Sequence, residues 1–293
     1  MKKKNFIFSI TALLTVLPTL GSSTFVSNKL EASYRSNHCT IVSDKRPFLV
    51  EFLPISEDTI PLHNLVENYK PQTVLNYDDA RALLYTQIYN VNDTVSCMYS
   101  GYQSPLLQTE ENPIMKLMKL NVFNSILTEH SFPKSKGAAE GNAKSDMHHL
   151  FPVRLGVNVS RYNHPFAEVL EEECDVWYID TEKYNSKPDK NESHSAKEGN
   201  GKFEPQDSFK GNVARAVFYF YTMYQLQADL ADDSFFELQK ETLLAWHNQD
   251  PVDELELKRT YLIAKYQSDK PNPFVLDASL AGRLYVTETA FTE

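Results

Sequence analysis

The sequence contains few cysteines, and this limits the kinds of site that it can build. Cys39, Cys97 and Cys174 are the three in 293 residues. They allow one disulfide with one thiol left over, and the sequence does not choose the pair. None lies beside a histidine in a nucleophile motif, so the sequence does not favour a cysteine-dependent enzyme.

Long apolar runs are also scarce. The run from Phe6 to Leu20 contains Pro18 and is shorter than the roughly 20 residues that a membrane helix needs. It follows three lysines at residues 2–4 and precedes small residues at 21–23, which is the pattern of a secretory signal peptide. We therefore expect residues 1–23 to be cleaved and the mature protein to be secreted or periplasmic, without stable membrane association. An uncleaved anchor is the alternative, and no cysteine follows the run to carry a lipid.

Positive charge is in deficit. The chain has 29 Lys and Arg against 39 Asp and Glu, a formal charge of -10, and loss of residues 1–23 would make it -13 because three lysines and no acid are removed. Such a chain is not expected to be held to nucleic acid by its overall field. Any contact of that kind must come from a local patch.

One stretch, Thr128 to Phe166, gathers chemically useful side chains. It holds four of the eight histidines, five Lys or Arg against three acids, and no thiol that would favour a structural zinc site. Groups that titrate near neutral pH, hard oxygen ligands and cations suit phosphoryl transfer on an anionic substrate. A solvated face of mixed charge is the alternative.

The motifs in and beyond this stretch resemble a known family. In chain order they are Thr128-Glu129-His130, Phe132-Pro133-Lys134-Ser135, Lys144 to Pro152, Val157-Asn158, Ser160-Arg161, Asn163 to Phe166, Phe203-Glu204-Pro205, Lys210 to Ala216 and Asp250 to Glu254. This ordered set resembles the secreted bacterial endonuclease I and extracellular ribonuclease family, which belongs to the ββα-metal (His-Me finger) nucleases. Each motif alone is weak, whereas the ordered set is specific.

The resemblance implies an α+β fold, with a ββα-metal core embedded in a mainly helical single domain. We expect a strand from Ser125 to His130, a second strand from His148 to Val153, and a helix from Arg154 to Asn163. Residues 24–75 are expected to be an N-terminal extension wrapped on the domain. The nuclease domain then covers residues 76–293, with an exposed flexible polar insertion at about 183–202.

The resemblance also implies roles for three residues. His130 would be the general base, and Glu129 and Asn158 would bind a divalent metal, with Mg²⁺ expected and Mn²⁺ or Ca²⁺ as alternatives. A buried structural histidine and a capping asparagine are the competing interpretations. Adjacent strand residues point to opposite faces, so Glu129 and His130 should diverge unless the backbone twists or bulges.

The residues around these three are less defined. Asp146, His148 and His149 are expected to support the site or the scaffold, and at most one of the adjacent histidines should face the site if both lie on a strand. Known members have an arginine between the catalytic histidine and the metal asparagine, but Arg154 is the one arginine in that interval. Lys144 or Arg161 is therefore expected to contact the phosphate.

Hydrophobic periodicity predicts further elements. They are a helix from Tyr77 to Asn90, a strand from Thr94 to Tyr99, a packing segment from Asn112 to Asn124, and a long helix after Pro205 with Lys210 and Arg215 on its polar margin. A capping box, Ser234 with Glu237, predicts a helix to about His247. Asp250-Pro251 predicts another to about Gln267, with Leu255, Leu262 and Tyr266 inward. Pro271 and Pro273 are expected to end helical structure, after which residues 274–285 pack back.

Together these features predict a secreted, monomeric, divalent-metal-dependent nuclease of low sequence specificity. It would hydrolyse phosphodiester bonds in DNA, RNA or both to 5′-phosphate ends. A secreted nucleic-acid-binding protein with the same fold and no turnover is the alternative. A metal-dependent phosphodiesterase or phosphatase acting on small substrates is a third possibility.

Overall fold

The computed structural model describes residues 62–106, 124–189 and 196–286. All described residues belong to one compact unit, Pro54–Glu293. The predictions for residues 1–23, for residues 24–61 and for most of the segment from Asn112 to Asn124 lie outside the described ranges.

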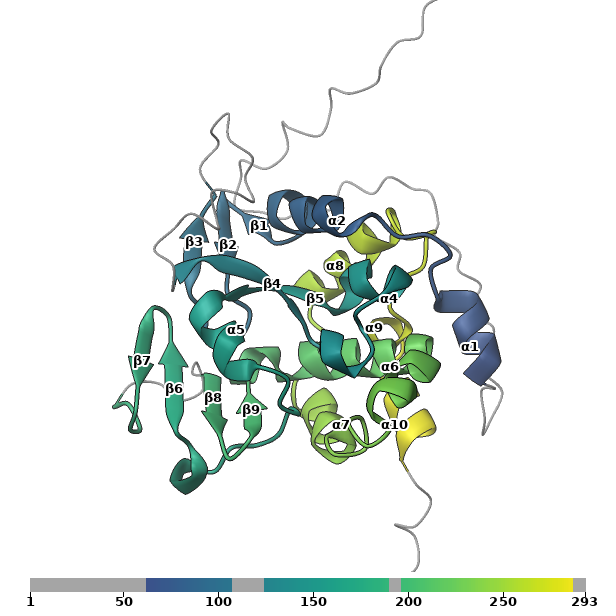
Figure 1. Cartoon of the computed structure of the whole chain (residues 1–293). Coiled ribbons are helices and arrows are strands. Elements are labelled where there is room, and N and C mark those ends of the chain that lie inside the picture. Colours follow the sequence, from purple (N-terminus) through teal and green to yellow (C-terminus); the bar gives the residue numbers. More distant parts are fainter. Residues whose placement is uncertain (1–61, 107–123, 190–195, 287–293) are drawn as a thin grey trace, which may run out of the picture. The chain divides into compact units, whose positions relative to one another are not determined.

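A two-stranded sheet and a helix form the centre of the described unit (Figure 1). Strand β4 (Ile126–His130) pairs antiparallel with β5 (Leu150–Arg154), so that His130 lies opposite Leu150. Helix α5 (Leu155–Arg161) follows β5 directly and packs on both strands. The predicted first strand and helix are therefore confirmed to within one or two residues at each end.

The predicted second strand begins two residues late. His148 and His149 lie in a 3-10 turn, η4 (Met147–His149), and not on β5. The Asp146 carboxylate accepts a hydrogen bond from the His148 backbone N–H at 3.0 Å and caps this turn. Aspartate commonly competes with the strand ladder in this way. Strand alternation therefore does not apply to the two histidines, and both are fully buried.

The long helix α6 (Lys210–Asp232) packs against η4 and carries much of the core. Its buried apolar face confirms the predicted helix. Arg215 is not on a polar margin, however, because it is 1% exposed and binds Glu256 of α8 (Glu254–Ala264) through contacts of 2.6–3.0 Å. Lys210 is also buried. Lys210 Nζ lies 2.9 Å from Glu204 Oε1. Both positions looked like solvent-facing charge in the sequence because the fold alone brings their acidic partners beside them.

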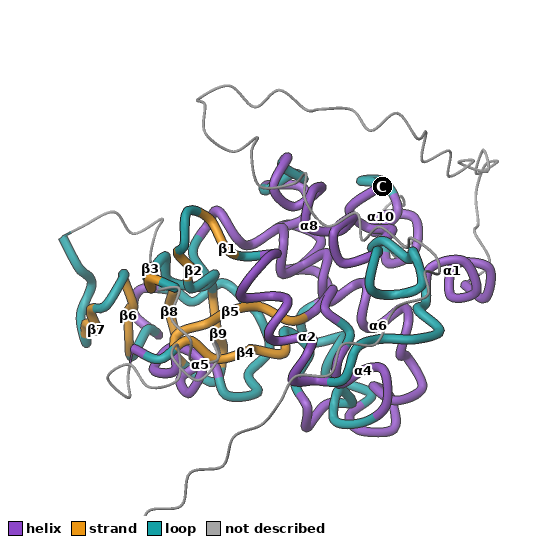
Figure 2. Tube along the Cα trace, turned by 90° about the horizontal axis from the view of Figure 1, so that it is seen from above, coloured by secondary structure: helices purple, strands orange, loops and turns teal. Residues whose placement is uncertain are grey.

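The other helices complete a mainly helical region. In Figure 2 most of the helices lie on the right and the strands lie on the left. The helices are α1 (Leu62–Tyr69), α2 (Tyr77–Leu83) continued by a π-helical turn (Leu84–Ile88), α4 (Gly141–Ser145), α7 (Lys240–Gln249), α9 (Pro273–Leu276) and α10 (Leu280–Tyr285). Short 3-10 turns lie at Lys134–Lys136, Glu171–Glu173 and Asp207–Phe209.

Two small antiparallel sheets flank the centre. One contains β1 (Asn90–Val91), β2 (Thr94–Ser96) and β3 (Gln103–Pro105), and the other, in the order β7-β6-β8-β9, contains β6 (Val176–Ile179), β7 (Glu182–Tyr184), β8 (Ala196–Gly199) and β9 (Lys202–Glu204). Strands β7 and β8 lie at the two ends of the segment at about 183–202, where the sequence predicts an exposed flexible insertion. Its strands are short and half-exposed, so they lack the apolar alternation that would have revealed them.

Two helix-cap predictions in the C-terminal part need correction. Ser234 does not cap a helix, since its hydroxyl bonds Asp232 and α7 begins only at Lys240. Helix α8 is capped by Asp253, whose carboxylate accepts from Glu256 N–H, while the Asp250 carboxylate accepts from Gly211 N–H near the start of α6.

The inward face of α8 is also different from the prediction. Leu255 is 69% exposed, and the buried positions are Glu256, Arg259, Thr260, Ile263 and Ala264. Pro273 does not end helical structure, because it is the first residue of α9. Residues 273–285 do pack back onto the core, as expected.

Two further sequence features can be placed. Cys97 is buried and Cys174 is half-buried, and both are free thiols. Among the described residues, no helix is both long and apolar enough to cross a membrane.

Candidate active site

A cavity of about 340 Å³ lies where β4 ends and α5 ends. It is lined by Thr128, Glu129, His130, Pro133, Lys134 and Ser135 from the first side, and by Asn158, Arg161, Tyr162 and Asn163 from the second. Glu129, His130, Asn158 and Arg161 were all candidates in the sequence, and the fold brings them together. Glu129 and His130 are adjacent on β4, and both border the cavity.

Glu129 is a buried carboxylate held by an arginine. Its Oε1 atom lies 3.2 Å from Arg161 Nε, and neither side chain is more than 6% exposed. Oε1 receives no hydrogen bond. Burial raises the pKa of Glu129 to about 7, and Arg161 acts in the opposite direction. Placing a cation beside this carboxylate would favour its ionised form.

His130 is held in one tautomer by a backbone carbonyl. Its Nε2 lies 2.9 Å from the Lys144 carbonyl oxygen, which can only accept, so Nε2 carries the proton and Nδ1 carries the lone pair. Burial is the main cause that keeps the pKa of His130 well below its usual range, and His149 adds to this effect. The imidazole is therefore neutral at neutral pH and can accept a proton.

Arg161 links the two sides of the cavity. Besides Glu129 it contacts two backbone carbonyls, Ser131 at 2.7 Å and Tyr162 at 3.2 Å, and its side chain is fully buried. The guanidinium therefore has three protein partners and no exposed surface. The contact of Arg161 or Lys144 with the phosphate stays a prediction. The geometry of Arg161 is that of a group that positions Glu129.

A comparison with known protein families identifies the family of this chain. The model for Endonuclease I matches residues 61–279. The chain belongs to the Endonuclease I family. The chain is also 29% identical over 215 residues to an extracellular ribonuclease of Bacillus subtilis (strain 168), covering 66% of this chain and 65% of the relative. It is 29% identical over 164 residues to an extracellular ribonuclease of Bacillus amyloliquefaciens, covering 50% of this chain and 49% of that relative. The chain thus spans about half to about two thirds of the length of the curated relatives that it matches.

Endonuclease I family members are phosphodiester hydrolases that generally use a divalent metal. The donors at this cavity fit a hard cation: Glu129 offers a buried oxygen without a hydrogen bond, and the half-buried Asn158 borders the same space. Mg²⁺ commonly takes one or two protein oxygens and keeps several waters. A richer site is not formed, since no cluster of three or more His, Cys, Asp or Glu that could hold a metal occurs in the described ranges.

A group of cations lies beside His130 in this Endonuclease I family member. Arg81, Lys134 and Lys144 all lie over the ring of Tyr77, at 5.4, 4.7 and 5.6 Å from its centroid. That ring lies 5.5 Å from the His130 ring. Lys134 lines the cavity, whereas Lys144 does not. Burial, Lys144 and Arg81 together lower the pKa of Lys134, as expected for positive charges placed close together.

Asp146, His148 and His149 lie behind the cavity and do not line it. The buried Asp146 carboxylate accepts hydrogen bonds from Tyr219, Tyr224 and Gln267, at 2.7–2.8 Å. His148 contacts the Lys270 carbonyl, and His149 contacts the Ala143 carbonyl and lies 5.3 Å from the His130 ring. These three residues join α6 and the C-terminal segments to the back of the site.

Tyr162 was not selected from the sequence, although it borders the cavity and is 71% exposed. It ends α5 with φ 50° and ψ -117°. The other non-glycine residues with positive φ among the described residues are Asn, Asp or Ser, which tolerate it better. A bulky residue in such a conformation costs on the order of 1–3 kcal/mol. The sequence carried no signal for this, because Tyr162 looks like an ordinary loop residue between two motifs.

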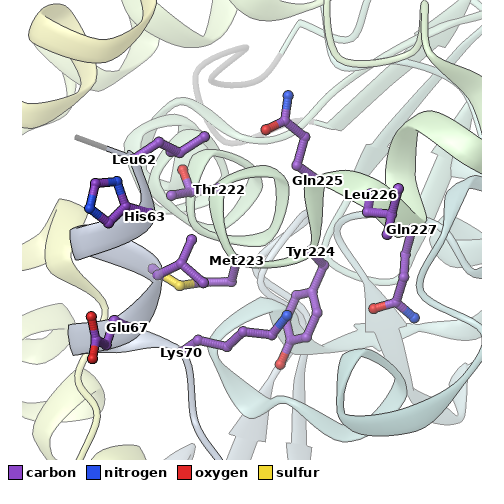
Figure 3. A pocket seen from close by; sticks show the side chains of 11 residues that line it. Leu62, His63, Glu67, Lys70, Thr222, Met223, Tyr224, Gln225, Leu226 and Gln227 are labelled. Atoms are coloured by element: carbon purple, nitrogen blue, oxygen red, sulfur yellow. The ribbon is translucent and has the colours of Figure 1, made fainter. Parts of the chain in front are cut away.

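A larger cavity, of about 600 Å³, lies between α1 and α6 (Figure 3). Its walls include Leu62, Val66, Met223 and Leu226, and its few ionisable groups are His63, Glu67 and Lys70. His63, Glu67 and the amides of Gln225 and Gln227 border this cavity, but none of these residues belongs to the ordered motifs, whereas Glu129, His130 and Asn158 at the cavity beside β4 all do. The candidate site is therefore the smaller cavity.

Proposed function

We propose that this protein is a secreted endonuclease that hydrolyses phosphodiester bonds in DNA, RNA or both, with low sequence specificity and with 5′-phosphate products. One observation supports this above all: Glu129, His130 and Asn158 border one cavity in a chain of the Endonuclease I family. The two relatives are named extracellular ribonucleases, which supports secretion and includes RNA among the candidate substrates.

His130 is the proposed general base. Its Nε2–H is donated to the Lys144 carbonyl, so Nδ1 can take a proton from a water molecule. The neutral imidazole required for this step is favoured by burial. A general base aligned in this way contributes roughly 10²- to 10⁴-fold to a hydrolysis rate.

Glu129 and Asn158 are the proposed metal ligands. They would hold a hard divalent ion, which would supply positive charge to the substrate phosphate and to the leaving oxygen. Arg161 holds Glu129 in place through the contact with its carboxylate. Asn158 is one turn before Arg161 on α5, so a single helix presents the amide ligand and the arginine that fixes the other ligand.

The phosphate charge is met by lysine in this proposal. Lys134 lines the cavity and Lys144 shares the Tyr77 ring with it. Lysine acts as a point charge and lacks the bidentate geometry of arginine, so it neutralises the phosphate without fixing its orientation tightly. Because such contacts carry no sequence information, they are consistent with low sequence specificity.

One digestion assay tests the proposal. Mature protein is incubated with plasmid DNA and with total RNA, in Mg²⁺, Mn²⁺, Ca²⁺ or excess EDTA, and product ends are labelled to find the phosphate. We expect metal-dependent fragmentation with 5′-phosphates. Undiminished cleavage in EDTA would contradict the metal, and binding without cleavage in every metal would favour the nucleic-acid-binding alternative. Hydrolysis of small phosphate diesters or monoesters, without cleavage of DNA or RNA, would favour the small-substrate phosphodiesterase or phosphatase.

A further inference from the structure

The side chain of Tyr162 is an exposed aromatic ring at the mouth of the candidate site. It is 71% exposed and lines the same cavity as Glu129 and His130. Val159, one turn earlier on α5, is 66% exposed. The rest of the cavity lining is mostly charged and polar.

The backbone on both sides of this ring is fixed. The Tyr162 carbonyl accepts from Arg161 Nη1 at 3.2 Å, and the Tyr162 N–H donates to the Asn158 carbonyl at 3.1 Å. Asn163 next to it donates to Ser135 Oγ at 3.3 Å. The His164 ring packs edge-on to Tyr162, with centroids 5.8 Å apart. The ring is therefore held from one side and left open to solvent on the other.

The positive φ of Tyr162 is maintained by groups of the site itself. Arg161 and Asn158 both hold the Tyr162 backbone. Arg161 also fixes Glu129, and Asn158 is a proposed metal ligand. A tyrosine in this conformation is unfavourable unless its surroundings require it. The same contacts that order the site thus also set the direction of an exposed ring.

We propose that Tyr162 is a stacking platform for an unpaired nucleobase adjacent to the phosphodiester in the cavity, so that the site favours single-stranded nucleic acid. This rests on the proposed nuclease function for the identity of the ligand. Every base presents a flat face, so stacking adds affinity without sequence preference. A base inside a duplex is already stacked on its neighbours and is not available to the ring.

Binding is measured with chelator present, so that no turnover is needed. The probes are a short single strand that carries one 2-aminopurine, whose fluorescence is quenched by stacking, and a duplex of the same sequence. Loss of one base–aromatic stack should weaken binding roughly 5- to 150-fold. We therefore expect Tyr162→Ala to weaken single-strand binding within that range and to abolish the quenching. We expect Tyr162→Phe to bind like the wild type, and duplex affinity to change little in either variant.

Two controls keep the result specific. Tyr162→Leu keeps apolar bulk without an aromatic face and should behave like Tyr162→Ala. Tyr266→Ala removes another exposed tyrosine, which does not line the cavity, and should change nothing. Thermal unfolding of each variant verifies that it is folded.

The outcomes separate this inference from the proposed function. Equal single-strand affinity and equal quenching in Tyr162→Ala and wild type would overturn the stacking platform, even if the protein cleaves nucleic acid. Tyr162-dependent quenching in a protein that cleaves nothing in any metal would uphold the platform and contradict the nuclease. Tyr162→Leu binding like the wild type would also overturn it, since apolar bulk and not a π-face would then suffice.

Discussion

Arg161 Nε lies 3.2 Å from Glu129 Oε1 in a pair whose side chains are 0% and 6% exposed. The sequence predicted that Lys144 or Arg161 contacts the substrate phosphate. The ion pair with Glu129 places the Arg161 guanidinium directly beside the proposed metal-binding carboxylate. A buried charge that loses its partner is costly, because the remaining ion has no water to solvate it.

Arg161→Ala should therefore destabilise the protein by about 3–5 kcal/mol, and should raise the metal concentration needed for half-maximal activity because an unpaired Glu129 holds a proton more tightly. Glu129→Gln removes the charge from the other side. In the double variant, the loss of unfolding free energy should be clearly smaller than the sum of the losses in the two single variants, as measured by denaturant unfolding. Additivity within about 0.5 kcal/mol would show that the two side chains do not interact.

The pH dependence of stability should reveal the two buried histidines behind the site. Burial lowers the pKa of His148 and of His149 to about 4. In the unfolded chain a histidine has a pKa of about 6.5, so the unfolded state binds more protons between these values. The contribution of the two neutral histidines to the free energy of unfolding is therefore complete above about pH 6.5, and it is lost as the pH falls toward 4.

This is checked by urea unfolding at a series of pH values. Carboxylates also titrate in the lower part of the window, so the comparison with His148→Gln isolates one histidine. The variant should show a shallower fall in unfolding free energy between pH 6.5 and 4. Parallel curves for variant and wild type would show that His148 protonation is not coupled to unfolding.

Substrate affinity should fall as the salt concentration rises, with a shallow slope, because few lysine–phosphate contacts hold the substrate. Lys134→Ala should weaken binding of DNA and RNA to a similar extent whatever the sequence, and should reduce the slope of log affinity against log salt by about one. Lys187→Ala, on a segment that does not line the cavity, serves as the surface-lysine control. An unchanged slope in Lys134→Ala would mean that this lysine does not contact phosphate.

The parts that sequence predicted well are those in which local pattern and fold agree. The strand ending at His130, the helix carrying Asn158 and the apolar face of α6 each follow from short-range periodicity or from the ordered motifs. Their arrangement around one cavity follows from the antiparallel pairing of β4 with β5. Motif order identified the family for the same reason, since the motifs lie at the elements that build the site.

The parts that sequence did not predict depend on partners far along the chain. Arg215 looked like a surface charge until Glu256 was placed beside it, and Asp250 looked like the cap of its own helix although its carboxylate accepts from Gly211 N–H. His148 and His149 left the strand because of one aspartate cap. Tyr162 could not be recognised because its positive φ is required by contacts and not by its own preference.

The proposed role of His130 is the central claim, and it can be tested directly by comparing turnover with affinity in His130→Ala. A general base acts in the transition state, so turnover should fall roughly 10²- to 10⁴-fold while nucleic-acid affinity stays nearly unchanged. Because His130 also donates to the Lys144 carbonyl, melting curves must accompany the rates, and losing that bond can cost about 1–3 kcal/mol. The turnover rates of the wild type and of His130→Ala are therefore expressed per folded molecule. A fall in turnover of that size with affinity retained is the predicted result, and activity within about threefold of wild type per folded molecule would contradict the assignment.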